Sequence, residues 1–265
     1  MPTLYIPHGG GPCFFMAWTA GPADTWDRMG AWLRGLRATI GVPRAIVVVS
    51  AHWEAEAFSV TGHPGPSLIY DYYGFPEHTY RIEYPAPGSP VLAERIRTLL
   101  GQAGTRVRVD PERGFDHGVF IPFKLIYPDA DIPIVQLSLQ TGLAPGAHLD
   151  AGAAIAPLRR EGVLIVGSGM SYHNLRRFGV ENNADSDRFD AWLGETVCAA
   201  DASVRNDGLR AWQRAPAARE AHPREEHLLP LMVVAGAAEN DPGERIFSDR
   251  VMGATVSAYR FGGSV

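Results

Sequence analysis

The sequence predicts an α/β fold: a single three-layer domain, residues 1–265, with a largely parallel or mixed central sheet covered by helices on both faces. Short apolar runs typical of buried strands alternate with longer segments whose apolar residues recur at helical spacing. With 265 residues, 46% of them apolar, the chain can also bury one large core. These two observations favour one α/β domain over two smaller ones.

The predicted strands are runs of apolar residues, several of them rich in Val and Ile. Residues 45–50 (AIVVVS) and 163–167 (VLIVG) show no polar alternation, which is typical of strands buried on both faces of a parallel sheet. The final strand is expected to be antiparallel and at an edge of the sheet. The predicted strands are residues 4–7, 45–50, 106–109, 134–139, 163–167 and 255–259.

The predicted helices lie between these strands and have Gly, Pro or Asp near their ends. They are residues 26–36, 90–100, 122–127, 147–159, 188–200 and 227–235. Two long stretches fit neither pattern. Residues 62–87 are rich in aromatic side chains and are expected to form a binding loop, with a self-packed surface loop as the alternative. Residues 201–224 are polar and are expected to form a segment that closes over a functional site.

Charge and composition exclude several classes of partner. The net charge is -5, and the 24 basic residues form no stripe, which argues against nucleic-acid binding. No run of about 18 apolar residues and no charged-then-apolar leader is present, so we expect a cytoplasmic protein without a membrane partner. Cys13 and Cys198 are expected to be free thiols. A homodimer is the default expectation, because most soluble oligomers are symmetric.

Four histidines occupy comparable positions beside small residues. His8, His52 and His173 follow apolar strands, and His227 precedes an apolar helical run. A lone histidine at a strand end is more often a hydrogen-bonded filler than a ligand, but four in such settings favour one metal site, because ligands bind at the C-terminal ends of parallel strands. Imidazoles without a cysteine pair suit Fe, Zn, Cu or Ni, and three of them leave positions open for substrate, as in a catalytic site.

His117 has a different setting, in a glycine-bracketed turn before an amphipathic run. Its neighbour Asp116 is expected to raise the pKa of the imidazole and suit it to proton transfer or to hydrogen bonding an oxyanion.

Several motifs, in this order along the chain, resemble those of the class III extradiol ring-cleavage dioxygenases (the LigB-like superfamily), and within it the DOPA dioxygenase branch. The resemblance extends from residue 3 to about residue 260. The motifs are HGGGP at 8–12, SAHWE at 50–54, YDYYGFP at 70–76, YPAPG at 84–88, GFDHG at 114–118, DIPIVQLSL at 131–139 and HNLR at 173–176.

The resemblance implies a non-haem Fe(II) enzyme that opens a catechol ring beside its two hydroxyls with O2. It matches His8, His52 and His227 to metal-binding positions, and His173 to a position that is either a further ligand or the acid/base. His117 matches a histidine that contacts the substrate. Zn(II) can replace iron in purified protein, because the divalent order favours it at the same ligands.

One of the matched metal-binding positions differs from that of the protocatechuate-type members of the superfamily, which have a carboxylate where this chain has His227. Glu226 lies next to it, so a site of two histidines and one carboxylate is the alternative; the pattern of the DOPA branch favours His227.

With L-DOPA as substrate, the resemblance implies a seco-DOPA semialdehyde that cyclises to betalamic acid or, after cleavage on the other side, to muscaflavin. Tyr72, Arg176 and Arg177 are candidates for holding the amino-acid tail, by hydroxyl or charge alone.

Three competing functions remain. A zinc hydrolase would use the same histidines with Glu226 as base, and a non-catalytic protein of the Memo type would keep a similar histidine set. A serine hydrolase is the weakest, because His173 stands where the nucleophile elbow of residues 169–173 needs its last glycine.

Overall fold

The computed structural model describes residues 1–263 and is built on an eight-stranded mixed sheet with strand order β4-β3-β5-β2-β6-β1-β8-β7. The four central strands β5, β2, β6 and β1 are parallel. On one side β8 is antiparallel to both β1 and β7, and on the other side β3 is antiparallel to β5 and parallel to β4. The strands are β1 Thr3–Pro7, β2 Ala45–Ala55, β3 Phe58–Thr61, β4 Val107–Asp110, β5 Ile134–Gln140, β6 Val163–Gly169, β7 Gly243–Val251 and β8 Ala254–Phe261.

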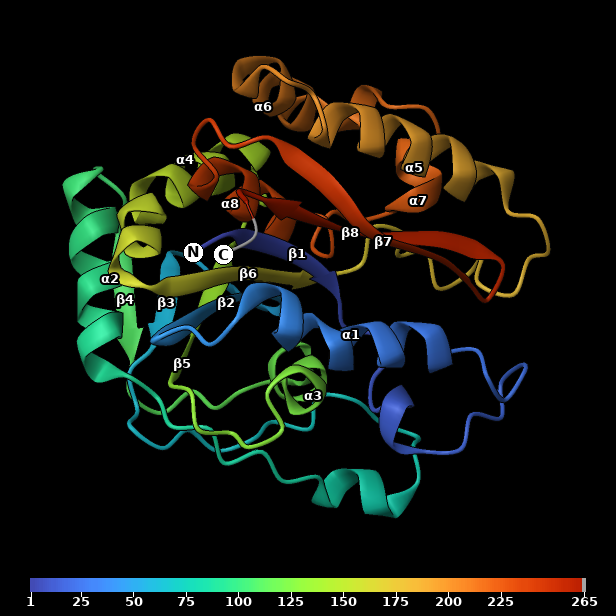
Figure 1. Ribbon diagram of the computed structural model, residues 1–265, viewed down its shortest axis with the longest axis horizontal. Coiled ribbons are helices and arrows are strands. Elements are labelled where there is room, and N and C mark those ends of the chain that lie inside the picture. Colours follow the sequence, from blue (N-terminus) through green and yellow to red (C-terminus); the bar gives the residue numbers. More distant parts are fainter. Residues whose placement is uncertain (264–265) are drawn as a thin grey trace.

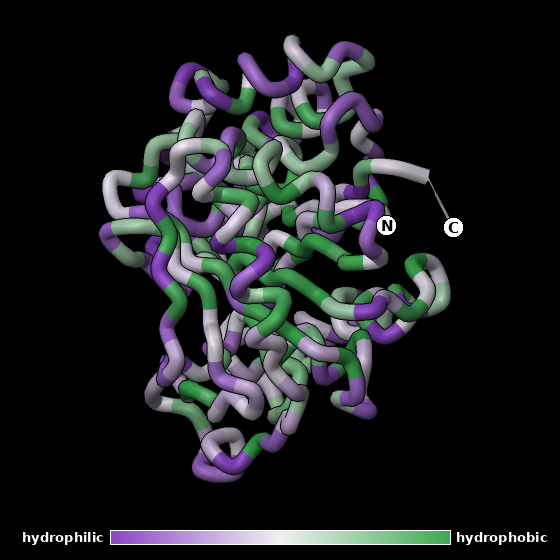
Figure 2. Tube along the Cα trace, turned by 90° about the vertical axis from the view of Figure 1, so that its left-hand side faces the viewer, coloured by the Kyte–Doolittle hydropathy of each residue, from purple (hydrophilic) through white to green (hydrophobic). Residues whose placement is uncertain are grey.

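Helices cover both faces of the sheet, which makes the predicted three-layer α/β class correct (Figure 1). In that view α1 and α3 lie below the sheet, and α4, α8, α5 and α6 lie above it. The helices are α1 Asp27–Ile40, α2 Pro90–Gln102, α3 His117–Ile126, α4 Pro145–Ile155, α5 Ala184–Val197, α6 Ala202–Arg210, α7 Ala218–Ala221 and α8 Leu229–Ala237. Hydrophobic segments run through the middle of the molecule, and hydrophilic segments lie mainly at its periphery (Figure 2).

The register of the central strands decides where the site forms. Pro7 at the end of β1 pairs with Gly169 at the end of β6, and Ser50 in β2 pairs with Ser168. Because these strands are parallel, the segments that follow Pro7 and Gly169 leave the sheet at one edge, beside the later residues of β2. That edge is therefore where residues far apart in the sequence meet.

Six strands were predicted and all six are present, but two were missed. β3 has only four residues, and β7 carries charged residues at partly exposed positions, so neither has the apolar run of a buried strand. The final strand β8 lies between β1 and β7, so the prediction that it is at an edge was wrong; β7 occupies that edge.

The segment 201–224 is also different from the prediction. It folds into α6, a 3-10 turn Trp212–Arg214 and α7, and none of its residues lines either of the two cavities described below. Most of its polar residues face solvent, while Arg205 and His222 are buried together with Leu209, Trp212 and Ala221, so the helical pattern is present but short. It therefore does not close over the site.

Helix α3 begins at His117, five residues before the predicted start, and contains Pro122. A proline has no N–H to donate to the carbonyl four residues earlier, so the carbonyl of Gly118 is left without its helical partner.

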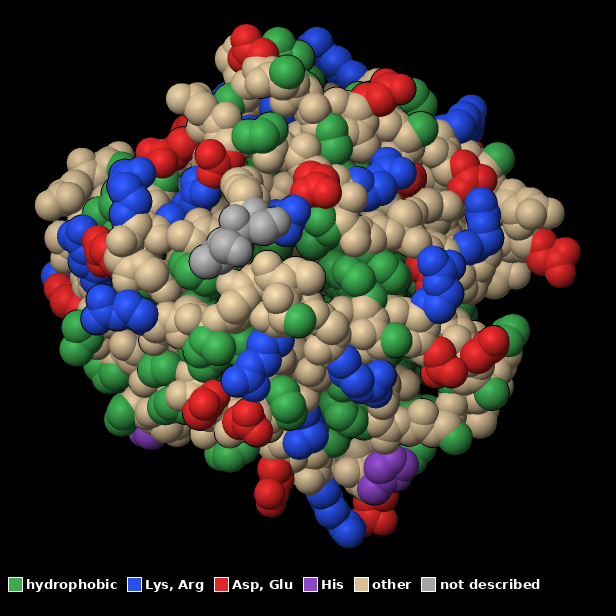
Figure 3. Space-filling model, in the orientation of Figure 1, with side chains coloured by type: hydrophobic (Ala, Val, Ile, Leu, Met, Phe, Trp, Pro, Cys, Tyr) green, Lys and Arg blue, Asp and Glu red, His purple; other side chains and the backbone are tan. Residues whose placement is uncertain are grey.

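The prediction of two free cysteines is confirmed, and the charged side chains can be followed on one face of the molecule. On the face shown in Figure 3, basic and acidic side chains are interspersed. Cys13 and Cys198 are both free. Among the described residues, no helix is both long enough and apolar enough to cross a bilayer.

Arg205 in α6 is a buried cation that holds the C-terminal end of α8. Its guanidinium donates to the backbone carbonyls of Ala235, Glu239 and Asp241 at 2.8–3.1 Å, and only 1% of the residue is exposed. These are the carbonyls that a helix end and the turn after it leave unpaired.

We expect Arg205→Met to lower the free energy of unfolding by about 3 kcal/mol, because it leaves several buried carbonyls without donors. Urea denaturation followed by circular dichroism measures this. The control is Arg210→Met in the same helix, whose partners Asp150 and Asp207 are exposed; its effect should stay within about 0.5 kcal/mol. Equal effects of the two substitutions would show that Arg205 does not hold the end of α8.

Candidate functional site

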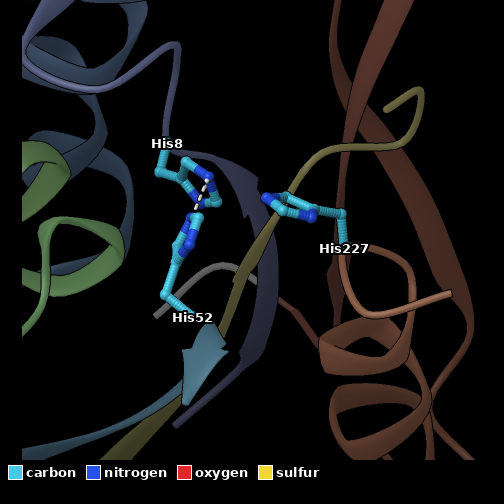
Figure 4. A group of neighbouring side chains, drawn as sticks. All are labelled: His8, His52 and His227. Carbon is cyan, nitrogen blue, oxygen red and sulfur yellow. Dashed lines mark hydrogen bonds between the residues drawn. The ribbon is translucent and has the colours of Figure 1, made fainter. Parts of the chain in front are cut away.

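Three histidines converge at the C-terminal edge of the parallel strands. His8 follows β1, His52 lies in the last part of β2, and His227 precedes α8; their rings point toward one another (Figure 4). The Nε2 atoms of His8 and His52 are 3.1 Å apart, and the ring centroid of His227 lies 5.2 Å from that of His8 and 4.9 Å from that of His52. One ligand atom from each of the three residues lies within 4.8 Å of the others. The three segments therefore bring their imidazoles to one point.

The end of β6 fixes two of these histidines through its backbone. The amide of His8 donates to the carbonyl of Gly169, and the carbonyl of His227 accepts from the amide of Met170 and from the hydroxyl of Tyr5. A side chain at Gly169 would overlap the carbonyl of His227, so only glycine allows this approach. Gly169 thus allows His227 to lie beside His8.

Hydrogen bonds determine which nitrogen of each imidazole is free. Ser168 donates its single hydroxyl proton to the carbonyl of Gly118 and can only accept from Nδ1 of His8, 3.1 Å away. Nδ1 of His227 lies 2.9 Å from Oε1 of Glu226, a carboxylate that only accepts. In both rings Nδ1 carries the proton and Nε2 presents its lone pair, as metal-binding histidines do.

Burial keeps these imidazoles uncharged. It holds the pKa of His8 and of His227 well below the usual histidine range, and the neighbouring imidazoles lower both further. Burial, followed by the repulsion of His117, lowers the pKa of His52 to about 3. At neutral pH all three are in the form that a divalent cation requires.

Glu226 lies behind the histidines. Its Oε1 contacts Nδ1 of His227 and lies 3.4 Å from Nδ1 of His173, and Arg224 reaches its Oε2 at 3.5 Å. Burial would raise the pKa of Glu226, but hydrogen bonding to His173 and the nearby positive charge of Arg224 outweigh it and lower that pKa. The geometry corresponds to a carboxylate–histidine pair that orients a ligand, with His227 rather than Glu226 facing His8 and His52.

His117 is the first residue of α3, and its ring centroid lies 4.0 Å from that of His52. The expectation that Asp116 is its acidic partner was wrong. Asp116 is fully buried and bonds to Ser50 and Gln136, whereas Asp71 accepts from Nδ1 of His117 at 2.8 Å and from its backbone amide at 2.9 Å. Adjacent residues at a helix start point in different directions, so the neighbour in sequence is not the neighbour in space.

His173 comes from the loop after β6. Its ring stacks on that of His227, with centroids 3.3 Å apart and planes inclined by 16°. It is about one-fifth exposed, unlike the buried ring of His227. Of the residues predicted for catalysis and metal binding, His8, His52, His117, His173 and His227 all lie in this one cluster.

A cavity of about 330 Å³, here called the inner cavity, opens onto the five histidines. The indole rings of Trp18 and Trp26 and the phenyl rings of Phe75 and Phe178 line it, together with the aliphatic side chains of Met170, Leu175 and Met252. Its size and flat aromatic walls suit a small planar molecule. Phe75 belongs to the aromatic loop 62–87, which therefore does contribute to the cavity.

None of the three candidates for substrate binding, Tyr72, Arg176 and Arg177, lines the inner cavity. The hydroxyl of Tyr72 donates to the carbonyl of Thr79 within its own loop, and its ring lies 5.8 Å from that of His117. Arg176 is exposed. Ser171, the nucleophile of the serine hydrolase alternative, is buried and its oxygen accepts from the amide of Ser257.

Sequence reasoning missed several residues of the site. Asp71 lies in the motif at 70–76 and Ser168 directly follows the predicted strand 163–167, but nothing in the sequence links them to particular histidines. Trp18, Trp26 and Met252 come from segments without any motif. Within residues 1–263, three groups of side chains have a spacing that could hold a metal ion: besides His8, His52 and His227, they are His52, Asp71 and His117, and His173, Glu226 and His227. In each of those two groups the carboxylate contacts Nδ1 of a histidine, so the all-histidine group has the most free lone pairs.

Comparison with known proteins identifies the family of this chain. The family model described as "Catalytic LigB subunit of aromatic ring-opening dioxygenase" matches residues 3–262. The chain belongs to this family, and its relatives place it in the branch of the DOPA dioxygenases. It is accordingly an extradiol aromatic ring-opening dioxygenase, and its family is metal-dependent in general.

The relatives include enzymes from plants, fungi and bacteria. The chain is 43% identical to the 4,5-DOPA dioxygenase extradiol of Beta vulgaris, with 77% of each chain covered. It is 36% identical to the protein of the same name from Escherichia coli K12 (89% of this chain, 85% of that protein) and 41% identical to the dioxygenase tasH of Hapsidospora irregularis (84% and 72%). The crystal structure of an uncharacterized protein from Escherichia coli K12 has a TM-score of 0.76, 30% identity and coverage of 99% and 100%.

We expect Gly169→Ala to weaken binding of a divalent metal at least about tenfold, because the added methyl group displaces the backbone of His227. Isothermal titration with Zn(II), which needs no catalysis, measures the affinity. Gly101→Ala in α2 is the matched control, since a methyl group there meets nothing within 4 Å. Unchanged affinity in Gly169→Ala would mean that this close approach does not place His227.

We expect Glu226→Gln to weaken metal binding by about 10–100-fold and not to abolish it, because the carboxylate orients His227 without coordinating the metal. The same titration applies, with Glu225→Gln as the control, since Glu225 pairs with the exposed Arg219. Complete loss of binding in Glu226→Gln would instead assign the carboxylate as a ligand.

Proposed function

We propose that this chain uses Fe(II) and O2 to cleave the ring of L-DOPA or a related catechol, with His8, His52 and His227 as the metal ligands. The observation that carries the proposal is the convergence of three neutral histidines, of which His8 and His227 present a free Nε2, on an aromatic-walled cavity that also contains His117 and His173. The names of the relatives support DOPA as the first substrate to test. We also propose that residues 1–265 form one catalytic domain, since a single sheet carries the whole site.

The spacing of the ligand atoms supports an ion with open positions. Two nitrogens 3.1 Å apart, as in His8 and His52, are adjacent positions around one ion when each lies about 2.1 Å from it. Three neutral imidazoles leave the ion's charge available to a catecholate, and Fe(II), when bound, supplies the ability to react with O2. Zn(II) fits the same donors, so purified protein that contains zinc would be inactive until it is exchanged.

The residues around the ligands have separate tasks in this reaction. The flat walls of the inner cavity hold the catechol ring against the histidines, which replaces a chance encounter by a fixed orientation. His173, partly exposed and next to Glu226, accepts a proton from a catechol hydroxyl and returns it as the ring opens. His117, whose Nδ1 proton is held by Asp71, has Nε2 free to hydrogen-bond a substrate oxygen.

The product follows from the bond that breaks. Cleavage of L-DOPA beside its two hydroxyls adds both atoms of O2 and gives a seco-DOPA semialdehyde. Its amine can close on the aldehyde to betalamic acid after 4,5-cleavage, or to muscaflavin after 2,3-cleavage.

We expect the protein, loaded with Fe(II) without air, to consume one O2 per L-DOPA or simple catechol and to form a yellow product. An oxygen electrode and absorbance spectra measure both. No uptake with any catechol in protein shown to contain iron would contradict the proposal and favour a binding protein of the Memo type or a zinc hydrolase.

We expect His173→Gln to lower kcat by about 10²–10⁴-fold while iron is retained, because it removes a proton-transfer group and no ligand. His8→Gln should lose iron as well as activity. Iron content by atomic absorption, measured beside kcat, separates the two effects. Loss of iron in His173→Gln would assign His173 as a ligand.

A further inference from the structure

The polar groups of the inner cavity are concentrated at its histidine end. Away from the histidines and the backbone of the glycines at 9–11, the described lining is aromatic or aliphatic, and it contains no Lys or Arg. A carboxylate moved from water into such surroundings without a partner loses several kcal/mol of solvation. The part of the cavity that receives the ring substituent is therefore unfavourable for an anion.

The arginines near the inner cavity, which could have paired with a substrate carboxylate, do not line it. Arg176 is exposed, and Arg177 pairs with Asp185 at 2.7 Å. Neither lines the inner cavity, and the hydroxyl of Tyr72 is taken by the carbonyl of Thr79.

A second cavity of about 750 Å³, here called the outer chamber, shares Met252 with the inner cavity. Its two cations are already paired, Arg28 with Asp249 at 2.6 Å and Arg250 with Asp187 at 2.7 Å. Its lining also includes three further acidic side chains: Asp24, Asp27 and Glu181. Acidic side chains outnumber basic ones in the lining of the outer chamber, so its net charge is negative. It therefore repels a carboxylate that extends toward it from the inner cavity.

We propose that the preferred substrate is a catechol whose ring substituent is uncharged and apolar, and that the site discriminates against catechols that carry a carboxylate, L-DOPA included. This inference rests on the proposed function and narrows its substrate class. Selection arises both from favourable contact with the aromatic and aliphatic walls and from the absence of a partner for an anion.

The first test compares substrates that differ in charge and little else. They are 3-(3,4-dihydroxyphenyl)propionate, its methyl ester, 4-propylcatechol, and L-DOPA with its methyl ester. With iron-loaded protein, kcat/KM from O2 uptake should be at least about tenfold higher for each ester than for its acid, mainly through KM, and 4-propylcatechol should behave like an ester. Equal or higher kcat/KM for the acids would overturn the proposal.

A binding measurement separates this inference from the proposed function. Trp18 and Trp26 line the cavity, so their fluorescence should be quenched when a catechol binds to Zn(II)-loaded protein without air. The dissociation constants should be lower for the esters and 4-propylcatechol than for the acids, even if turnover fails. Tighter binding of the acids would overturn the inference, whereas absence of O2 uptake in the iron form contradicts only the proposed function.

A variant with an added cation provides the converse test. Leu175 lines the inner cavity but is 71% exposed, so its replacement leaves the core intact. Leu175→Arg should raise kcat/KM for the propionate about tenfold relative to its ester, and the matched control Leu175→Gln should not. If instead the native protein prefers L-DOPA and Arg28→Met or Arg250→Met weakens it, the outer chamber holds the charged tail and the proposal is wrong.

Discussion

The parallel pairing of β1, β6 and β2 is the constraint on which the rest of the structure depends. It fixes Pro7 opposite Gly169 and Ser50 opposite Ser168, so the chain leaves β1 and β6 at one edge beside His52. The sheet thus supplies, at no extra conformational cost, the convergence that a metal site needs. Helix α8 then packs on β6, and the two glycines of β6 allow its first residues to come close enough to add His227.

Around this frame, each imidazole is held by an oxygen from a different element. Ser168 holds His8, Glu226 holds His227, and Asp71 holds His117. The two carboxylates also face a second imidazole each: Asp71 lies 3.7 Å from Nδ1 of His52, and Glu226 lies 3.4 Å from that of His173. In the proposed metal site the three histidines are neutral, and the two carboxylates place negative charge just behind them, where it increases the basicity of the imidazoles and leaves positions on the metal free.

The features that could be predicted from the sequence are those that depend on residues close together in the chain. The central strands were predicted because uninterrupted apolar runs are a local signal; His8, His52 and His173 were predicted because they follow such runs, and His227 because it precedes an apolar helical run. β7 and the helices of residues 201–224 were missed because their exposed sides dilute the apolar pattern. Asp71 was missed as the partner of His117 because 46 residues separate them and Asp116, next in sequence, offered a simpler pairing. The cavity walls come from segments that meet only in the folded chain.

Pro122 shows how far a local backbone constraint reaches. In a helix without proline, the backbone N–H of residue 122 would donate to the carbonyl of Gly118. Pro122 has no N–H, and this carbonyl accepts a hydrogen bond from the hydroxyl of Ser168. Because the only hydroxyl proton of Ser168 is used in this bond, its oxygen can only accept from the ring of His8. The protonated nitrogen of His8 is therefore Nδ1. The missing N–H of one proline thus leaves a carbonyl open to the serine that sets the tautomer of an imidazole in another layer of the fold.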